Sequence, residues 1–249
     1  QLGFIKRHRR FGVAQVDRDA VLFDEIIAKH DLGHAHAVFG AARVRDRAHE
    51  GFVGVFDVAF LRCLPNLVLM TPSNQADCRN MLTTAFSLNG PSVVRYPRGS
   101  GVGPEASQQL ETIPVGKGLI VRKPKNAQAP GKKIAFVCFG PLLYSALEVA
   151  EELNATVADM RFVKPLDEEL LLDLANHHDA LVLIEDSAIQ GGAGSACLEV
   201  LSKYKVQIPT LQIGLPDEYV EHGDVSLLLD FYGLSPKKIL SKVREHFQI

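Results

Sequence analysis

The stretch Ile134–Met160, IAFVCFGPLLYSALEVAEELNATVADM, reads as a strand, a helix and a second strand. Its first six residues form an unbroken apolar run, which is typical of a strand buried on both faces. Apolar side chains then recur at intervals of three and four between Leu142 and Leu153, as in a helix with one apolar face. Thr156–Met160 follows as another short strand. This order predicts parallel strands joined by a helix.

The same alternation continues to the end of the sequence. Five further elements are predicted there: a helix opening near Asp167, a strand at Ala180–Ile184, a helix after the turn Gly191–Gly194, a strand at Thr210–Ile213, and a last helix that Ser235 caps ahead of Pro236. Residues 117–249 therefore predict an α/β layer fold with a mostly parallel sheet. The carboxyl ends of the strands usually carry the binding site in such folds.

Residues 49–99 predict a second strand, helix and strand. Leu67–Met70 is a short apolar run, and Ser73 is a suitable N-cap for the helix that follows it. That helix places Cys78, Met81, Leu82 and Ala85 on one face. Ser92–Tyr96 forms the second strand, which Pro97 stops.

Two segments lack a sustained pattern. Residues 100–116 are polar and contain Gly, Pro, Ser and Gln, so they are expected to form a linker. Residues 1–48 are rich in His and Arg, and only Ala20–Lys29 has helical spacing.

Composition excludes several classes of protein. The chain has 249 residues, 47% of them hydrophobic, which is enough for one large or two ordinary domains. A net charge of -2 gives no support for a nucleic-acid partner. The four cysteines form no CxxC pair, so neither a zinc site nor a disulfide framework is expected, and a cytoplasmic location fits. No apolar run reaches the roughly 18 residues of a membrane span.

Three patterns carry chemistry, each with a structural alternative. The turn Gly191–Ser195 opens a helix and could cradle a phosphate, although the pattern favours a tight turn with close helix packing. Arg95 and Arg98 flank Pro97 at a strand end, where a guanidinium binds either a phosphate or a carboxylate of a neighbouring domain. His49 precedes an acid and a glycine, as a proton shuttle would, yet a lone His is more often structural.

Two charged pairs fit an interface better than a catalytic site. Glu185-Asp186 follows a strand, where paired acids more often begin a helix or meet a neighbour than bind a metal. The charges of Asp159 and Arg161 either pair with a neighbouring domain or lie in a solvated loop.

Seven strings in order resemble one family, the 1-deoxy-D-xylulose-5-phosphate synthases of the transketolase superfamily. Among them FDVAFLRCLPN at 56–66 and PSVVRYPRG at 91–99 are the most specific. The others are MTPS at 70–73, PVGKG at 114–118, DMRFVKPLD at 159–167, GGAGS at 191–195 and GLPD at 214–217. The resemblance starts near His49 and covers about four fifths of the chain.

The resemblance implies a fold and a division into domains. Residues 49–110 would be the end of the pyrimidine-binding domain, and 111–249 the transketolase C-terminal domain, both α/β. Residues 1–48 would be an unmatched segment. The family enzyme is expected to be a homodimer.

The resemblance also implies a reaction, in which thiamine diphosphate and Mg²⁺ serve the condensation of pyruvate with D-glyceraldehyde 3-phosphate and the loss of CO₂. Arg98 matches the arginine that binds the aldehyde's phosphate. His49 matches the His of a Thr-His-x-Gly motif, which transfers protons and positions the substrate.

The sequence departs from the family around His49. Ala48 stands where the family has Thr, and about three extra residues, Phe52-Val53-Gly54, follow Gly51. The Asp-Arg-Ala-Gly, Glu-Gln-His and Gly-Asp-Gly strings, which serve the second phosphate arginine, the pyrimidine and Mg²⁺, do not occur in their places. A truncation, a frameshift or a fusion would each explain this.

The departures predict that the chain alone has little synthase activity. Two alternatives stay open: a non-catalytic dimerisation module, and the β-like half of a split transketolase or 2-oxo-acid dehydrogenase.

Overall fold

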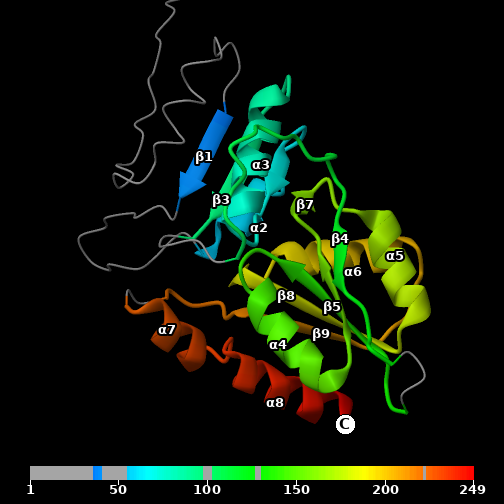
Figure 1. The fold of residues 1–249 in the computed structure, drawn as a ribbon. Coiled ribbons are helices and arrows are strands. Elements are labelled where there is room, and N and C mark those ends of the chain that lie inside the picture. The colour runs from blue at the N-terminus through cyan, green and yellow to red at the C-terminus, as the bar shows by residue number, and fades with distance from the viewer. Residues whose placement is uncertain (1–35, 41–54, 98–102, 127–129, 221–222) are drawn as a thin grey trace, which may run out of the picture. The chain divides into compact units, whose positions relative to one another are not determined.

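Two β-sheets organise the part of the chain that a computed structural model describes (Figure 1). That part is residues 36–40, 55–97, 103–126, 130–220 and 223–249. It belongs to the second of two units, Gln1–Leu32 and Gly33–Ile249, into which the chain divides. In chain order the elements are β1 (His36–Gly40), α2 (Asp57–Leu61), β2 (Val68–Met70), α3 (Gln75–Ser87), β3 (Ser92–Tyr96), β4 (Leu119–Arg122), β5 (Ile134–Phe139), α4 (Leu143–Leu153), β6 (Thr156–Asp159), β7 (Phe162–Lys164), α5 (Glu168–His177), β8 (Ala180–Ala188), α6 (Ala193–Lys203), β9 (Thr210–Leu215), α7 (Val225–Phe231) and α8 (Pro236–Phe247).

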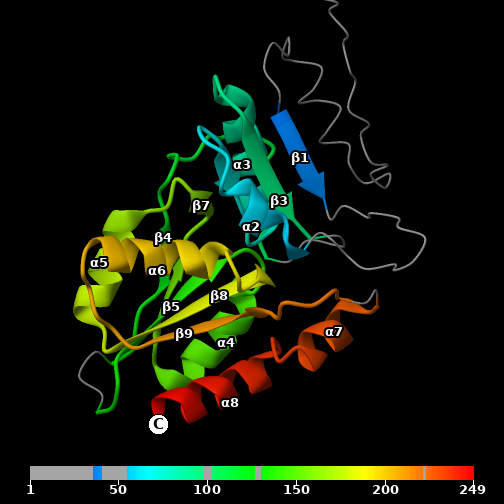
Figure 2. The ribbon, with the colours of Figure 1, turned by 180° about the vertical axis from the view of Figure 1, so that it is seen from behind.

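The larger sheet has the order β4-β6-β5-β8-β9 and is parallel except for β4, as the sequence predicts. Helices α4 and α8 cover one face, and α5 and α6 cover the other (Figures 1 and 2). Alternate side chains of one strand point to opposite faces, so Phe136 and Val182 pack under α4 and α8, whereas Val137 and Leu183 pack under α5 and α6. This explains the unbroken apolar runs.

The smaller sheet has the order β1-β3-β2-β7. Strands β1, β3 and β2 are parallel, and β7 runs antiparallel to β2, with Met70 opposite Phe162. The sheet thus takes β1 from before His49 and β7 from the later part of the chain, so it is not confined to residues 49–110. The sequence gives no sign of β7, because three residues are too few to show a period.

Helix starts differ from the prediction in one place. Asn74, not Ser73, caps α3, since its side-chain oxygen accepts a hydrogen bond from the Asp77 N–H at 2.9 Å. The Ser73 hydroxyl instead donates to the Asp77 carboxylate at 3.0 Å. Helix α5 begins near Asp167 as predicted, and the Asp167 side chain caps it. Ser235 is at the N-cap position of α8 as predicted, but its hydroxyl donates to Asp230 and makes no capping hydrogen bond.

The expected linker runs along α3. Residues 103–118 contain neither helix nor strand. The side chains of Gln75 and Arg79 donate to the carbonyl oxygens of Pro104 and Gln108, and Thr84 accepts from the N–H of Ile113. These contacts attach the linker to the smaller sheet's helix.

Strand β4 and helices α2 and α7 are not predicted from the sequence. Helix α7 has no buried residue, and β4 exposes three apolar side chains in a row, so neither shows the usual pattern. The predicted helix at Ala20–Lys29 lies outside the described residues. No helix within the described ranges is long and apolar enough to cross a membrane.

Candidate functional site

The carboxyl ends of β1, β3 and β2 meet at one edge of the smaller sheet, because these strands are parallel. Ligands bind at such edges in α/β folds. In the sequence, Arg98 follows the end of β3 by two residues, and His49 follows the end of β1 by nine. Both residues lie outside the described residues, and their roles stay predictions.

Arg95 lies on β3, one residue before the strand ends at this edge. Its Nε lies 3.3 Å from an Asp57 carboxylate oxygen, and its Nη1 is bonded to the Asp186 carboxylate. Its Nη2 also donates to the Asp186 main-chain oxygen at 3.2 Å. The side chains of Arg95, Asp57 and Asp186 are only 10, 9 and 17% exposed. Arg95 therefore forms an interdomain ion pair and is not available as a phosphate ligand.

Burial and charge act in opposite directions on this triad. Burial raises the pKa of Asp57, and the Arg95 charge lowers it by less. Burial lowers the pKa of Arg95, but the Asp186 and Asp57 carboxylates raise it by more. The guanidinium therefore stays charged between two acids. The interface interpretation of Asp186 is confirmed.

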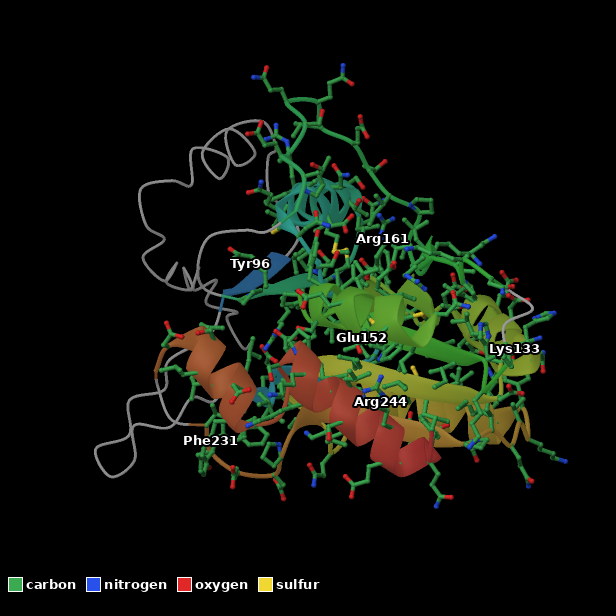
Figure 3. All side chains as sticks on the ribbon, turned by 60° about the horizontal axis from the view of Figure 1, so that its bottom comes forward. Tyr96, Lys133, Glu152, Arg161, Phe231 and Arg244 are labelled. Atoms are coloured by element: carbon green, nitrogen blue, oxygen red, sulfur yellow. The ribbon has the colours of Figure 1, made fainter. Side chains whose placement is uncertain are left out.

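A second polar cluster joins α3 to the turn before β7. The Arg161 guanidinium lies 2.9 Å from the Asp77 carboxylate, and Figure 3 shows Arg161 beside α3. Ser73 and Asn74 donate to the same carboxylate. Burial raises the pKa of Asp159, which accepts from the Arg161 N–H, to about 6. Arg161 therefore pairs with the neighbouring domain, one of the two alternatives that the sequence left open.

A third contact joins α2 to α6. Arg62 donates to the Gly191 carbonyl oxygen at 2.6 Å and pairs with the carboxylate of Glu199. Lys164, on β7, donates to the carbonyl oxygens of Arg62 and Leu64. Two cationic side chains, Arg62 and Lys164, thus bridge the segment after α2 and the C-terminal domain.

The glycine turn is a tight turn whose N–H groups already have an acceptor. The N–H groups of Ala193 and Gly194, at the start of α6, each donate to the Glu185 carboxylate at 2.8 Å. Ser187 also donates to this carboxylate. A phosphate at the turn would have to displace a buried acid, so the structure favours the tight-turn interpretation.

We expect Glu185 to make the stability of the fold depend on pH. Burial raises its pKa to about 7 from 4.5, although its three hydrogen bonds lower it. An acid with a raised pKa in the folded state stabilises the fold at low pH and loses that contribution as the pH rises through the folded pKa. As the pH rises from 5 to 8, we therefore expect the free energy of unfolding of Glu185→Gln to increase relative to that of the parent. Urea unfolding at several pH values measures this difference.

Glu199→Gln is the control for that prediction, because Glu199 is an exposed acid on α6, the helix whose first N–H groups bind Glu185. Its difference in stability from the parent should change little over the same range. Equal pH profiles for the parent and Glu185→Gln would show that Glu185 does not titrate there.

Sequence reasoning missed the roles of Asp57 and Asp77. Both are acids in helices with 6 and 8% exposure, and each pairs with an arginine far along the chain. The local sequence does not show which partner a buried acid has, but an acid on an otherwise apolar helix face indicates an ion pair.

The described residues do not fit a magnesium diphosphate site. Among them no group of three or more His, Cys, Asp or Glu side chains is arranged to hold a metal ion. The carboxylates of Asp57 and Asp186 are already paired with Arg95. A surface hollow of about 490 Å³ lies elsewhere, between α6 and the start of β9, where Leu198 and Thr210 are among its lining residues.

Comparisons with known proteins identify both domains. The family model "Transketolase, pyrimidine binding domain" matches residues 49–102, and "Transketolase, C-terminal domain" matches 125–239. A split-gene transketolase, described as an inactive β4 tetramer, superposes with a TM-score of 0.67 at 29% identity, over 86% of this chain and 65% of that one. A transketolase from Campylobacter jejuni shares the fold, with a TM-score of 0.56 at 14% identity over 84% of this chain and 31% of that one.

The sequence is similar to several 1-deoxy-D-xylulose-5-phosphate synthases. That of Chromobacterium violaceum is 44% identical over 225 residues, which is 90% of this chain and 35% of the relative. That of Cupriavidus metallidurans is 45% identical over 229 residues, 91% of this chain and 36% of the relative. The chain thus spans about a third of the length of these relatives.

The matched length also bears on the segment before His49. Only 201 residues run from His49 to Ile249, fewer than the 225 residues matched, so the similarity reaches upstream of His49. The strand β1, which pairs with β3 in register, lies in this upstream part. By its two domains and its sequence, the chain belongs to the transketolase superfamily and, within it, to the 1-deoxy-D-xylulose-5-phosphate synthase family.

Proposed function

We propose that this chain provides the pyrimidine-binding and C-terminal part of an enzyme that condenses pyruvate with D-glyceraldehyde 3-phosphate with loss of CO₂. The observation that carries the proposal is the identity of 43–46% to synthases of this name over about 90% of the chain. The chain keeps the specific strings FDVAFLRCLP and RYPRG within that match.

Two residues of this chain have proposed roles. Arg98 binds the phosphate of the aldehyde substrate, which suits a guanidinium at a strand end. His49 transfers protons and positions the substrate. Thiamine diphosphate, when bound, supplies the electron sink for decarboxylation.

The chain alone is proposed to be inactive. The family's diphosphate and Mg²⁺ strings do not occur in it, and the described residues hold no donor set for the metal. Positioning and electrostatics provide most of the rate in such sites. The diphosphate site would come from a further part of a longer chain or from a separate chain.

A separate chain is the second candidate, in which this protein is the β-like half of a split transketolase. The resemblance to a split-gene transketolase at 29% identity over 86% of this chain supports it. Self-association, which the family implies, would accompany either form. A module that only dimerises is the third, non-catalytic alternative.

A chimeric enzyme tests the reaction. Residues 55–249 of this chain would replace the matching residues of the Chromobacterium violaceum synthase, which then provides everything before Val55. We expect the chimera to form product from pyruvate and D-glyceraldehyde 3-phosphate. Arg98→Ala should raise the KM for the aldehyde by about 100-fold, because a charged contact to phosphate is lost. Lys123→Ala, which removes an exposed charge, is the control and should leave both KM values unchanged.

The chain alone is tested by titration calorimetry with thiamine diphosphate and Mg²⁺, for which we expect no binding. Extending the graft to residues 36–249 then tests His49, through His49→Ala. A folded 55–249 chimera without activity would contradict the proposed reaction, and tight cofactor binding by the chain alone would contradict the proposed inactivity.

A further inference from the structure

Asp186 belongs to the C-terminal domain, yet its carboxylate binds the strand that leads to the candidate site. Its partner Arg95 lies on β3, one residue before the end of that strand. Asp186 accepts from Arg95 twice, through a carboxylate oxygen and through its main-chain oxygen. The contact therefore fixes the direction of the guanidinium as well as its distance.

The site of Asp186 is shaped for this carboxylate. Gly140, at the end of β5, has a φ of +76°, and a Cβ there would lie 3.1 Å from the Asp186 carboxylate and 4.0 Å from the Pro72 carbonyl oxygen. The absence of a side chain at Gly140 lets the carboxyl end of the larger sheet approach the loop after β2. The larger sheet thus offers its usual ligand edge to a side chain of the neighbouring domain.

Asp57 completes the arrangement from the other side. It begins α2, and its carboxylate both accepts from the Val58 N–H at 2.7 Å and binds Arg95. Arg95 is thereby held between the start of α2 and the end of β8. Two fixed partners in different domains restrict the movement of the buried guanidinium. They therefore also restrict the movement of the end of β3.

We propose that Asp186 is a positioning residue for recognition of the substrate phosphate, and that it acts through Arg95 on the end of β3. This inference rests on the proposed function, which assigns the phosphate contact to Arg98, three residues after Arg95. A shift of about 1 Å in a substrate-binding group costs up to about 100-fold in rate. The C-terminal domain would then contribute to substrate affinity without touching the substrate.

The first test uses hydrogen exchange on the full chain. In Asp186→Asn we expect the amides of Arg95 and Tyr96 to exchange at least about fivefold faster, since one anchor of the strand end loses its charge. Glu199→Gln breaks another ion pair between the same two domains, that with Arg62, and should leave these amides unchanged. Unchanged exchange at Arg95 and Tyr96 in Asp186→Asn would overturn the proposal.

The second test is kinetic and uses the chimera with residues 55–249. Asp186→Asn should raise the KM for D-glyceraldehyde 3-phosphate about tenfold and leave the KM for pyruvate within about twofold. Loss of fold alone would lower the active fraction and so kcat, with neither KM affected. Equal changes in both KM values, or none, would overturn the proposal. An inactive chimera would count against the proposed function, and the exchange experiment would still decide the role of Asp186.

Discussion

The variant Arg95→Met should lose about 3–5 kcal/mol of its free energy of unfolding, the usual cost of breaking a buried ion pair by removing one partner. Methionine fills much of the arginine's volume but leaves the carboxylates of Asp57 and Asp186 buried without their shared cation. Urea unfolding at pH 8, followed by far-ultraviolet circular dichroism, measures the loss.

The loss should shrink as the pH falls. Burial already raises the pKa of Asp57, and without Arg95 this pKa rises further. Because the folded pKa then lies above the unfolded one, protonation favours the folded variant, and its deficit is largest above the folded pKa. Unfolding at pH 5 and pH 8 should therefore give a smaller difference from the parent at pH 5.

Arg244→Met is the matched control. Arg244 on α8 lies 3.5 Å from Glu152 on α4, and both side chains are more than half exposed (Figure 3). Exposed pairs contribute about 0–1 kcal/mol. If Arg95→Met costs no more than Arg244→Met, the triad does not stabilise the chain and the account of Arg95 fails.

The sequence predicts the strands of the larger sheet other than β4, and the helices that cover it, because these elements have regular apolar patterns. Ile134–Phe139 is β5 to the residue, and the predicted helix from Leu142 begins one residue later, at Leu143. A strand buried on both faces is apolar throughout, and a helix with one buried face repeats its apolar side chains about every 3.6 residues. Both therefore leave a clear pattern in the local sequence. The fold class follows from these patterns alone.

Contacts between domains leave no such pattern. The sequence allowed Arg95 to bind either a phosphate or a carboxylate, and its partners Asp57 and Asp186 lie 38 and 91 residues away. Strand β7 escapes notice for the same reason, because its pairing with β2 is decided by tertiary structure. Only the resemblance assigns His49 and Arg98, and those assignments stay predictions.

The glycine turn gives the second large effect, through Gly192→Ala. A Cβ at Gly192 would overlap the Glu185 carboxylate and the main-chain oxygen of Ala188. The carboxylate cannot move aside without giving up the N–H groups of Ala193 and Gly194, and the Ala188 oxygen belongs to a buried strand. We therefore expect a loss of about 2–4 kcal/mol, from overpacking together with lost buried hydrogen bonds.

Gly90→Ala is the control for Gly192→Ala, because nothing lies within 4 Å of a Cβ at Gly90. It should change the free energy of unfolding by no more than about 0.5 kcal/mol.

A shift of the turn at Gly192 would also disturb Gly191, whose carbonyl oxygen accepts from Arg62, so the contact between α2 and α6 should weaken. Faster hydrogen exchange in α2 of Gly192→Ala would report this. If Gly192→Ala had the same free energy of unfolding as the parent, the turn would accommodate a Cβ at this position. The assignment of the turn's N–H groups to Glu185 would then be wrong.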